Sequence, residues 1–256
     1  MSVRPPAVAG TFYPADPRDL TAAVDGMLDA AKGEGGLPTA LVAPHAGYVY
    51  SGPVAASAYA LLRGSEVRRV AILGPAHFVP LRACAVPASD RWETPLGEVE
   101  IDAELRAVTG VAVDEVPFEP EHSLEVQLPF LQRVLPTGFS VLPVAVGACS
   151  PVEVADVIGR LAPDVFVVVS TDLSHYHDDG TAKRLDRRTA DAVLALDPEA
   201  IGPEDACGAF ALGGLVEHAL RRGLTAELVD LRTSADTAGD PRRVVGYGAF
   251  AFLGRV

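Results

Sequence analysis

Three short apolar segments, each followed closely by polar residues, place the strongest constraint on the fold of this chain. Residues Thr39–Ala43, Arg69–Leu73 and Val165–Ser170 have the length and apolar content of buried strands. Pro44 and Pro75 follow the first two segments, and proline cannot continue a central strand. The segments therefore predict short, fully buried strands that end at defined positions.

Helical segments separate these strands along the chain. Asp16-Pro17 is typical of a helix start, and Leu20, Val24 and Leu28 form an apolar stripe behind it. Further helices are predicted from a Ser51 cap to Leu62, from Glu121 onward, over Pro151–Leu161, up to about Leu196, and from Cys207-Gly208 to about Arg221. Strands that alternate with helices predict an α/β fold. We expect a single three-layer domain over residues 1–256, with a mainly parallel central sheet flanked by helices.

The composition excludes several classes of protein. Hydrophobic residues make up 49% of the chain, enough for a sizeable core, so a disordered chain is not expected. The formal net charge is -13, which disfavours nucleic acid and anionic membrane surfaces as partners. No apolar segment approaches the roughly 18 residues of a membrane span. The odd number of cysteines is typical of reduced thiols, and we expect a cytoplasmic protein.

The residues after the three predicted strands can converge. The carboxyl ends of parallel strands meet at one edge of a sheet, where α/β proteins bind ligands. His45 and His77 follow two of the strands, and Asp172 and His175 follow the third. If the strands are neighbours, one cleft collects these four residues. Imidazoles with an anionic third ligand suit a transition metal, but a polar site for an organic ligand without metal fits the same pattern.

Two other residues allow more than one interpretation. His122 lies at a predicted helix start beside Glu121, where a cap or surface pairing is favoured over metal ligation. Cys207 lies among small residues at another helix start. Free cysteines are often small core residues, but a helix start also favours the thiolate that binds metals. The chain lacks the Walker A, dinucleotide-binding, G-x-S-x-G and H-E-x-x-H motifs, which disfavours phosphoryl transfer, NAD chemistry and serine hydrolysis.

A series of motifs runs in order almost from end to end of the chain: RPPAVAGTFYP, PHAGYVYSG, LGPAHF, EHSLEVQLPFLQ, STDLSHYH, and TSADTAGD with VVGYGAFAF. Together they resemble the Memo family, whose bacterial and archaeal members are named AmmeMemoRadiSam system protein B. The resemblance implies the fold of class III extradiol (LigB-type) dioxygenases. It also implies that the metal ligands are His45, His77 and Cys207, with Asp172 and His175 lining the same cleft.

Cys207 stands where the ring-cleaving dioxygenases have a glutamate ligand. A thiolate is softer than a carboxylate and favours Cu(I) or Zn over an oxygen-activating iron site. Dioxygenase activity therefore does not follow from the fold alone.

The sequence leaves three functional hypotheses. The first is a metal-dependent redox protein that binds one transition metal ion, iron or copper before zinc. In it His175, oriented by Asp172, is the general acid or base, and Tyr48, Tyr50 and His122 bind the substrate. The second is a non-catalytic module that binds a peptide or protein on a vestigial dioxygenase fold, with an AMMECR-type protein and a radical SAM enzyme as candidate partners. The third is a zinc-dependent hydrolase.

Overall fold

A computed structural model of the chain describes residues 2–31, 36–161 and 163–254. Its described strands form one twelve-stranded sheet in the order β1-β5-β6-β8-β3-β9-β2-β12-β10, with β11 paired to β12 and with β4 and β7 at the margin of β8. Five adjacent strands in the middle run parallel: β6 (Gly97–Ile101), β8 (Ser140–Val146), β3 (Arg69–Pro75), β9 (Phe166–Ser170) and β2 (Ala40–Ala43). Antiparallel pairs extend this centre on both sides.

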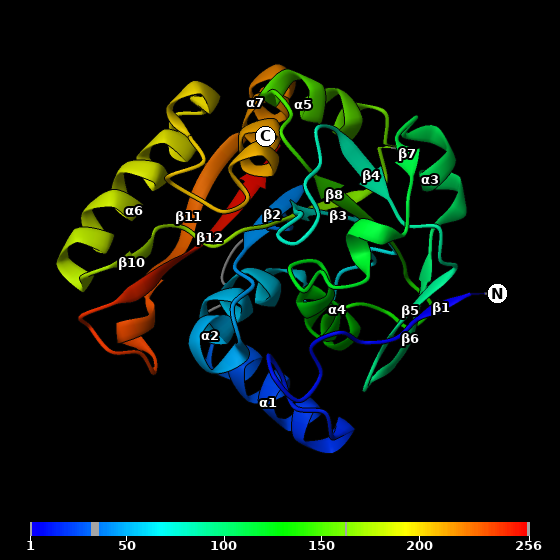
Figure 1. The fold of residues 1–256 in the computed structure, drawn as a ribbon, viewed down its shortest axis with the longest axis horizontal. Helices are drawn as coiled ribbons and strands as arrows, with labels where there is room; N and C mark the ends of the chain where they lie inside the picture. The colour runs from blue at the N-terminus through cyan, green and yellow to red at the C-terminus, as the bar shows by residue number, and fades with distance from the viewer. Residues whose placement is uncertain (1, 32–35, 162, 255–256) are drawn as a thin grey trace.

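The remaining strands are β1 (Val3–Arg4), β4 (Cys84–Val86), β5 (Arg91–Thr94), β7 (Ala112–Val113), β10 (His175–His177), β11 (Thr225–Thr233) and β12 (Val244–Leu253). The α-helices are α1 (Pro17–Ala30), α2 (Tyr48–Tyr59), α3 (Ala103–Val108), α4 (Leu128–Val134), α5 (Pro151–Gly159), α6 (Asp179–Leu194) and α7 (Ala209–Arg222). Figure 1 shows α1, α2 and α4 on one side of the sheet and α5 and α7 on the other. The predicted α/β fold, a single domain with helices on both sides of a mostly parallel sheet, is confirmed.

Local sequence explains the first helix. The Asp16 side chain accepts the backbone N–H groups of Arg18 and Asp19, and Pro17 occupies the first turn, where its missing N–H costs nothing. The predicted stripe of Leu20, Val24 and Leu28 is buried. None of the helices in the described part of the chain is long and apolar enough to cross a membrane.

Two predicted helix starts are wrong. The helix after His45 begins at Tyr48 and not at Ser51. Ser51 lies inside the first turns, where its hydroxyl donates to the Ala46 carbonyl and does not cap a helix start. The segment that starts at Glu121 is a loop, followed by a 3₁₀ turn over Glu125–Gln127 and then by α4. In this loop the Glu121 carboxylate accepts the backbone N–H groups of His122 and Ser123.

Candidate metal centre

The central strand order brings the predicted site residues together. β9 lies between β2 and β3 and is parallel to both, so the carboxyl ends of all three strands meet at one edge. His45 follows β2, and its imidazole lies 5.2 Å from that of His77, which follows β3. The His122 ring completes the cluster at 4.8 Å from His77 and 5.5 Å from His45, measured between ring centroids. Potential ligand atoms of these three histidines all lie within 4.8 Å of one another, so the group can hold a metal ion.

His45 is the deepest member of this histidine cluster, with only 2% of its surface exposed. Its Nδ1 lies 2.9 Å from the Ser170 hydroxyl, and its Nε2 lies 3.3 Å from the Cys207 sulfur. Burial, reinforced by the other histidines nearby, lowers the pKa of His45 well below its ordinary value. The ring is therefore neutral, which is the form that binds metals.

Glu121 holds the second histidine. One carboxylate oxygen lies 2.9 Å from Nδ1 of His77, and the other accepts the His77 backbone N–H at 2.6 Å. Burial opposes ionisation of this carboxyl group, but its bond to His77 and the bonds from backbone N–H groups outweigh burial and lower the Glu121 pKa to about 2. Because an ionised carboxylate only accepts, His77 carries its proton on Nδ1 and leaves Nε2 free.

His122 lies in the cluster, and not only in the cap or surface pairing that its sequence position favours. Its Nδ1 is 3.4 Å from the Glu121 carboxylate, and the Phe12 ring packs against it at a centroid distance of 4.6 Å. Burial lowers the His122 pKa. The sequence motif Glu-His-Ser contains both Glu121 and His122, but sequence reasoning did not identify the carboxylate as a site residue.

Cys207 approaches the cluster from the segment before α7. Besides its contact with His45, its sulfur accepts the Asp172 backbone N–H at 3.3 Å. Burial, together with the nearby Asp172 charge, raises the pKa of the thiol to about 12. The thiol therefore stays protonated in the metal-free protein, and a bound cation is needed to favour the thiolate.

Asp172 and His175 lie at the same edge, but their hydrogen bonds differ from those that we predicted. In the described residues the Asp172 carboxylate accepts the backbone N–H of His45 at 2.8 Å, and no hydrogen bond joins it to the His175 ring. Burial raises the Asp172 pKa to about 7 and lowers the His175 pKa. Asp172 thus positions the segment that carries His45.

The two predicted substrate-binding tyrosines occupy different environments. Tyr48 is buried, and its hydroxyl donates to the Val126 carbonyl at 2.6 Å. Tyr50 is exposed, as are Val49 beside it and Phe78, which directly follows His77. The surface next to the histidines is therefore partly apolar.

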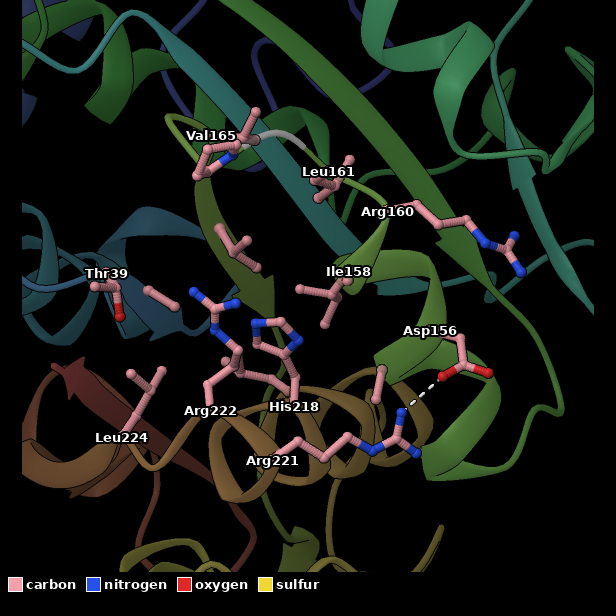
Figure 2. Close-up of a pocket in the computed structure, with 16 residues that line it drawn as sticks. Thr39, Asp156, Ile158, Arg160, Leu161, Val165, His218, Arg221, Arg222 and Leu224 are labelled. Atoms are coloured by element: carbon pink, nitrogen blue, oxygen red, sulfur yellow. Dashed lines mark hydrogen bonds and ion pairs between the residues drawn. The ribbon is translucent and has the colours of Figure 1, made fainter.

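A cavity lies elsewhere in the fold. It has a volume of about 790 Å³ and opens between α5, α7 and the amino-terminal ends of β2 and β9, at the opposite end of these strands from His45. Figure 2 shows His218 and Arg222 directed into this space, while Arg221 is bound to Asp156 at 2.6 Å. Arg221 and Arg222 form the last turn of α7, where cations offset the helix dipole. The cavity is thus separate from the histidine cluster.

The fold and the histidine cluster define an α/β protein with a metal-capable group of histidines at the carboxyl edge of its parallel strands. The chain belongs to the Memo family: the family model described as Memo-like protein matches residues 4–251. Similar proteins include the MEMO1 family proteins of Archaeoglobus fulgidus (40% identical), Aquifex aeolicus (38%) and Methanopyrus kandleri (37%). In each case the similarity covers at least 97% of this chain and at least 98% of the relative.

Proposed function

We propose that this chain is a metal-dependent redox protein that binds one transition metal ion through His45, His77 and Cys207. The close approach of three histidines, with donor atoms within 4.8 Å of one another, supports this proposal most strongly. The contact between Cys207 and Nε2 of His45 supports the sulfur as the third ligand. His122 is the competing third ligand, because it belongs to the same group.

The donor set fits a transition metal. Both His45 and His77 have an acceptor at Nδ1, which leaves their Nε2 atoms available. Two imidazoles with one sulfur suit iron, copper or zinc, whereas hard cations such as Mg²⁺ prefer oxygen. An iron or copper ion would supply one-electron redox chemistry in this cleft.

In this proposal the residues around the metal ligands accept a proton from the substrate and bind its organic part. Burial keeps His175 neutral near pH 7, so its ring can accept a proton from a bound ligand. Asp172 keeps the His45 segment in place through its backbone N–H. Tyr50 and Phe78 present exposed aromatic surface for an organic substrate.

Metal analysis tests this proposal. Protein purified without oxygen should contain about one equivalent of iron or copper, and the His45→Ala and His77→Ala variants should lose it. His218→Ala is the matched control, because His218 is half-buried on α7, outside the cluster. Wild-type protein that takes up no iron, copper or zinc would refute the proposal. One equivalent of zinc without redox activity would instead favour the zinc-dependent hydrolase.

Cobalt substitution separates the two candidates for the third ligand. Co²⁺ bound to a thiolate absorbs strongly through sulfur-to-metal charge transfer. We expect this absorption in the wild type and in His122→Ala, and its loss in Cys207→Ala. A spectrum without this absorption in the wild type would assign the third position to His122.

A non-catalytic binding module is the second candidate function. The exposed side chains of Val49, Tyr50 and Phe78, the last in contact with His77 and His122, favour it, because apolar surface of this kind binds partners. A pull-down against an AMMECR-type protein and a radical SAM enzyme tests it. Binding that survives the His45→Ala and His77→Ala substitutions would favour the module over the enzyme.

A further inference from the structure

We propose that Gln127 and Ser170 act as positioning residues that set the tautomer of His45. In this arrangement the ring proton resides on Nδ1, and Nε2, which lies 3.3 Å from the Cys207 sulfur, carries no proton. The inference deepens the proposed function, since it explains how a buried neutral ring is kept in the form that can bind a metal. It concerns the metal-free protein as well, and can be tested there.

The orientation of the Gln127 side chain follows from its neighbours. One amide atom lies 3.1 Å from the Pro44 carbonyl oxygen, which can only accept a hydrogen bond, so this atom is the amide nitrogen. The other amide atom, the oxygen, accepts the Tyr59 hydroxyl at 2.8 Å. The amide nitrogen also lies 2.7 Å from the Ser170 hydroxyl oxygen, to which it therefore donates.

The Ser170 hydroxyl donates its proton to one acceptor, the Ser123 carbonyl. The hydroxyl oxygen lies 2.6 Å from the Ser123 carbonyl oxygen, which again can only accept, so Ser170 donates to Ser123. If Ser170 donated elsewhere, two oxygens would stand 2.6 Å apart with no proton between them. Ser170 thus uses its single proton on Ser123 and can only accept from its other partners.

His45 is the remaining partner of Ser170. Its Nδ1 lies 2.9 Å from the Ser170 oxygen, so the ring must donate from Nδ1. A neutral imidazole has one N–H, which leaves Nε2 as an acceptor, 3.3 Å from the Cys207 sulfur. Because His45, Ser170, Gln127 and Tyr59 are almost completely buried, water cannot replace a lost partner.

The two proposed metal-binding histidines therefore donate their Nδ1 protons to different kinds of acceptor. His77 donates Nδ1–H to the ionised Glu121, whereas His45 donates to a neutral serine that is itself held by an amide. Both supports leave Nε2 free, but only the carboxylate adds negative charge to its ring. The neutral relay lets His45 remain uncharged at full burial without a buried counter-ion.

The wild-type protein provides the first test. In metal-free protein with ¹⁵N-labelled histidine, long-range ¹H–¹⁵N spectra distinguish the two tautomers, and the His45 signals are identified by their loss in His45→Gln. We expect the Nδ1–H pattern for His45 at pH 8. An Nε2–H pattern for His45 would overturn the inference, whatever the Ser170→Ala variant shows.

The Ser170→Ala variant tests whether the Ser170 hydroxyl sets the His45 tautomer. Without the hydroxyl, Nδ1 can accept from Gln127 while Nε2–H donates to the Cys207 sulfur, so we expect the Nε2–H tautomer or a mixture. Ser57→Ala is the matched control, because Ser57 is also buried but its hydroxyl contacts Pro53 and Asp230. An unchanged Nδ1–H pattern in folded Ser170→Ala would refute the role of Ser170.

Metal affinity gives an independent measure. In a competition with a chromophoric chelator, the Zn²⁺ dissociation constant should rise about 10- to 100-fold in Ser170→Ala, and should remain within about twofold of the wild type in Ser57→Ala. An affinity for Zn²⁺ unchanged by Ser170→Ala would count against the relay. A wild type with the Nδ1–H tautomer that binds no metal would refute the proposed function and still support the tautomer inference.

Discussion

The Glu121 carboxylate holds His77 at two points, the ring Nδ1 at 2.9 Å and the backbone N–H at 2.6 Å. The same carboxylate also accepts the backbone N–H groups of His122 and Ser123. One buried charge thus fixes the loop after β3 and the loop before α4 relative to each other. Two of the three clustered histidines owe their positions to it.

The Glu121→Gln substitution tests this arrangement. The amide keeps the shape of the side chain but removes the charge, and it cannot accept at every position that the carboxylate serves. We expect the Zn²⁺ affinity to fall about 10- to 100-fold, as is typical when a group behind a metal-binding histidine is changed. Glu119→Gln, an exposed carboxylate two residues away, is the control. Equal affinities in the two variants would show that Glu121 does not position His77.

The strand ends of the site were predictable from sequence because each is a local signal. Apolar runs with closely following prolines predict β2 and β3, and the position of a histidine past each strand follows directly. The adjacency of β2, β9 and β3 was only a condition of the sequence argument, because strand order leaves no local signal, and it is the structure that places β9 between the other two strands. With this order, the carboxyl ends that carry His45, His77 and Asp172 meet at one edge.

The loop that carries Glu121 and His122 could not be predicted in this way. It packs on the end of β3 through contacts between distant residues: Ser123 donates to the Pro75 carbonyl, and Leu124 lies against Gly74, where a Cβ atom would come within 2.9 Å. Such contacts leave no periodic pattern in the sequence. The Cys207 contact with His45 likewise joins residues 162 positions apart, and only the family resemblance pointed to it.

The buried carboxyl group of Asp186 should make the free energy of unfolding depend on pH. It is buried, one of its oxygens has no hydrogen-bond partner among the residues that the structure describes, and burial raises its pKa to about 6. Between about pH 4 and pH 6 the unfolded chain ionises this group while the folded protein keeps it protonated. Stability should therefore fall with rising pH across this window, by about 2–3 kcal/mol relative to Asp186→Asn.

Urea unfolding of the wild type and Asp186→Asn at several pH values between 4 and 7 measures this difference. Asp191→Asn, at an exposed position of the same helix, is the control, and its free energy of unfolding should change with pH as that of the wild type does. A difference between the wild type and Asp186→Asn that stays constant from pH 4 to pH 7 would contradict the prediction.

The N-terminal arm, residues 4–13, is held to Glu125 through a buried ion pair. Arg4 donates to the Glu125 carboxylate at 2.7 Å, and the same carboxylate accepts the Tyr13 hydroxyl and the backbone N–H groups of Ala7 and Val8. Removing one partner leaves an uncompensated buried charge, so Arg4→Ala should cost about 3–5 kcal/mol in the free energy of unfolding. Arg242→Ala removes an exposed partner of Asp240 and should leave the free energy of unfolding nearly unchanged, because solvent screens this pair. Similar losses in the two variants, measured by urea unfolding, would mean that the arm is not held by this pair.

Gly208 links the position of Cys207 to the end of β9. Its φ of -96° is accessible to any residue, but a Cβ atom here would come within 2.8 Å of the Thr171 side chain and 2.9 Å of the Ser170 carbonyl oxygen. Gly208→Ala must therefore push the segment before α7 away from β9, which should cost about 1–3 kcal/mol of stability. The same shift would separate the Cys207 sulfur from Nε2 of His45.

We therefore expect Gly208→Ala to weaken Zn²⁺ binding as well as folding. Gly26→Ala is the matched control: Gly26 lies within α1, and apart from the adjacent residues and the backbone of that helix no atom of the described residues comes within 4 Å of an added Cβ, so alanine there should stabilise the protein by about 0.5–1 kcal/mol. Unfolding curves and chelator competition on both variants separate the two effects. A Gly208→Ala protein that is less stable but binds Zn²⁺ as the wild type does would show that the ion does not need the sulfur, because the histidines would then suffice to hold it.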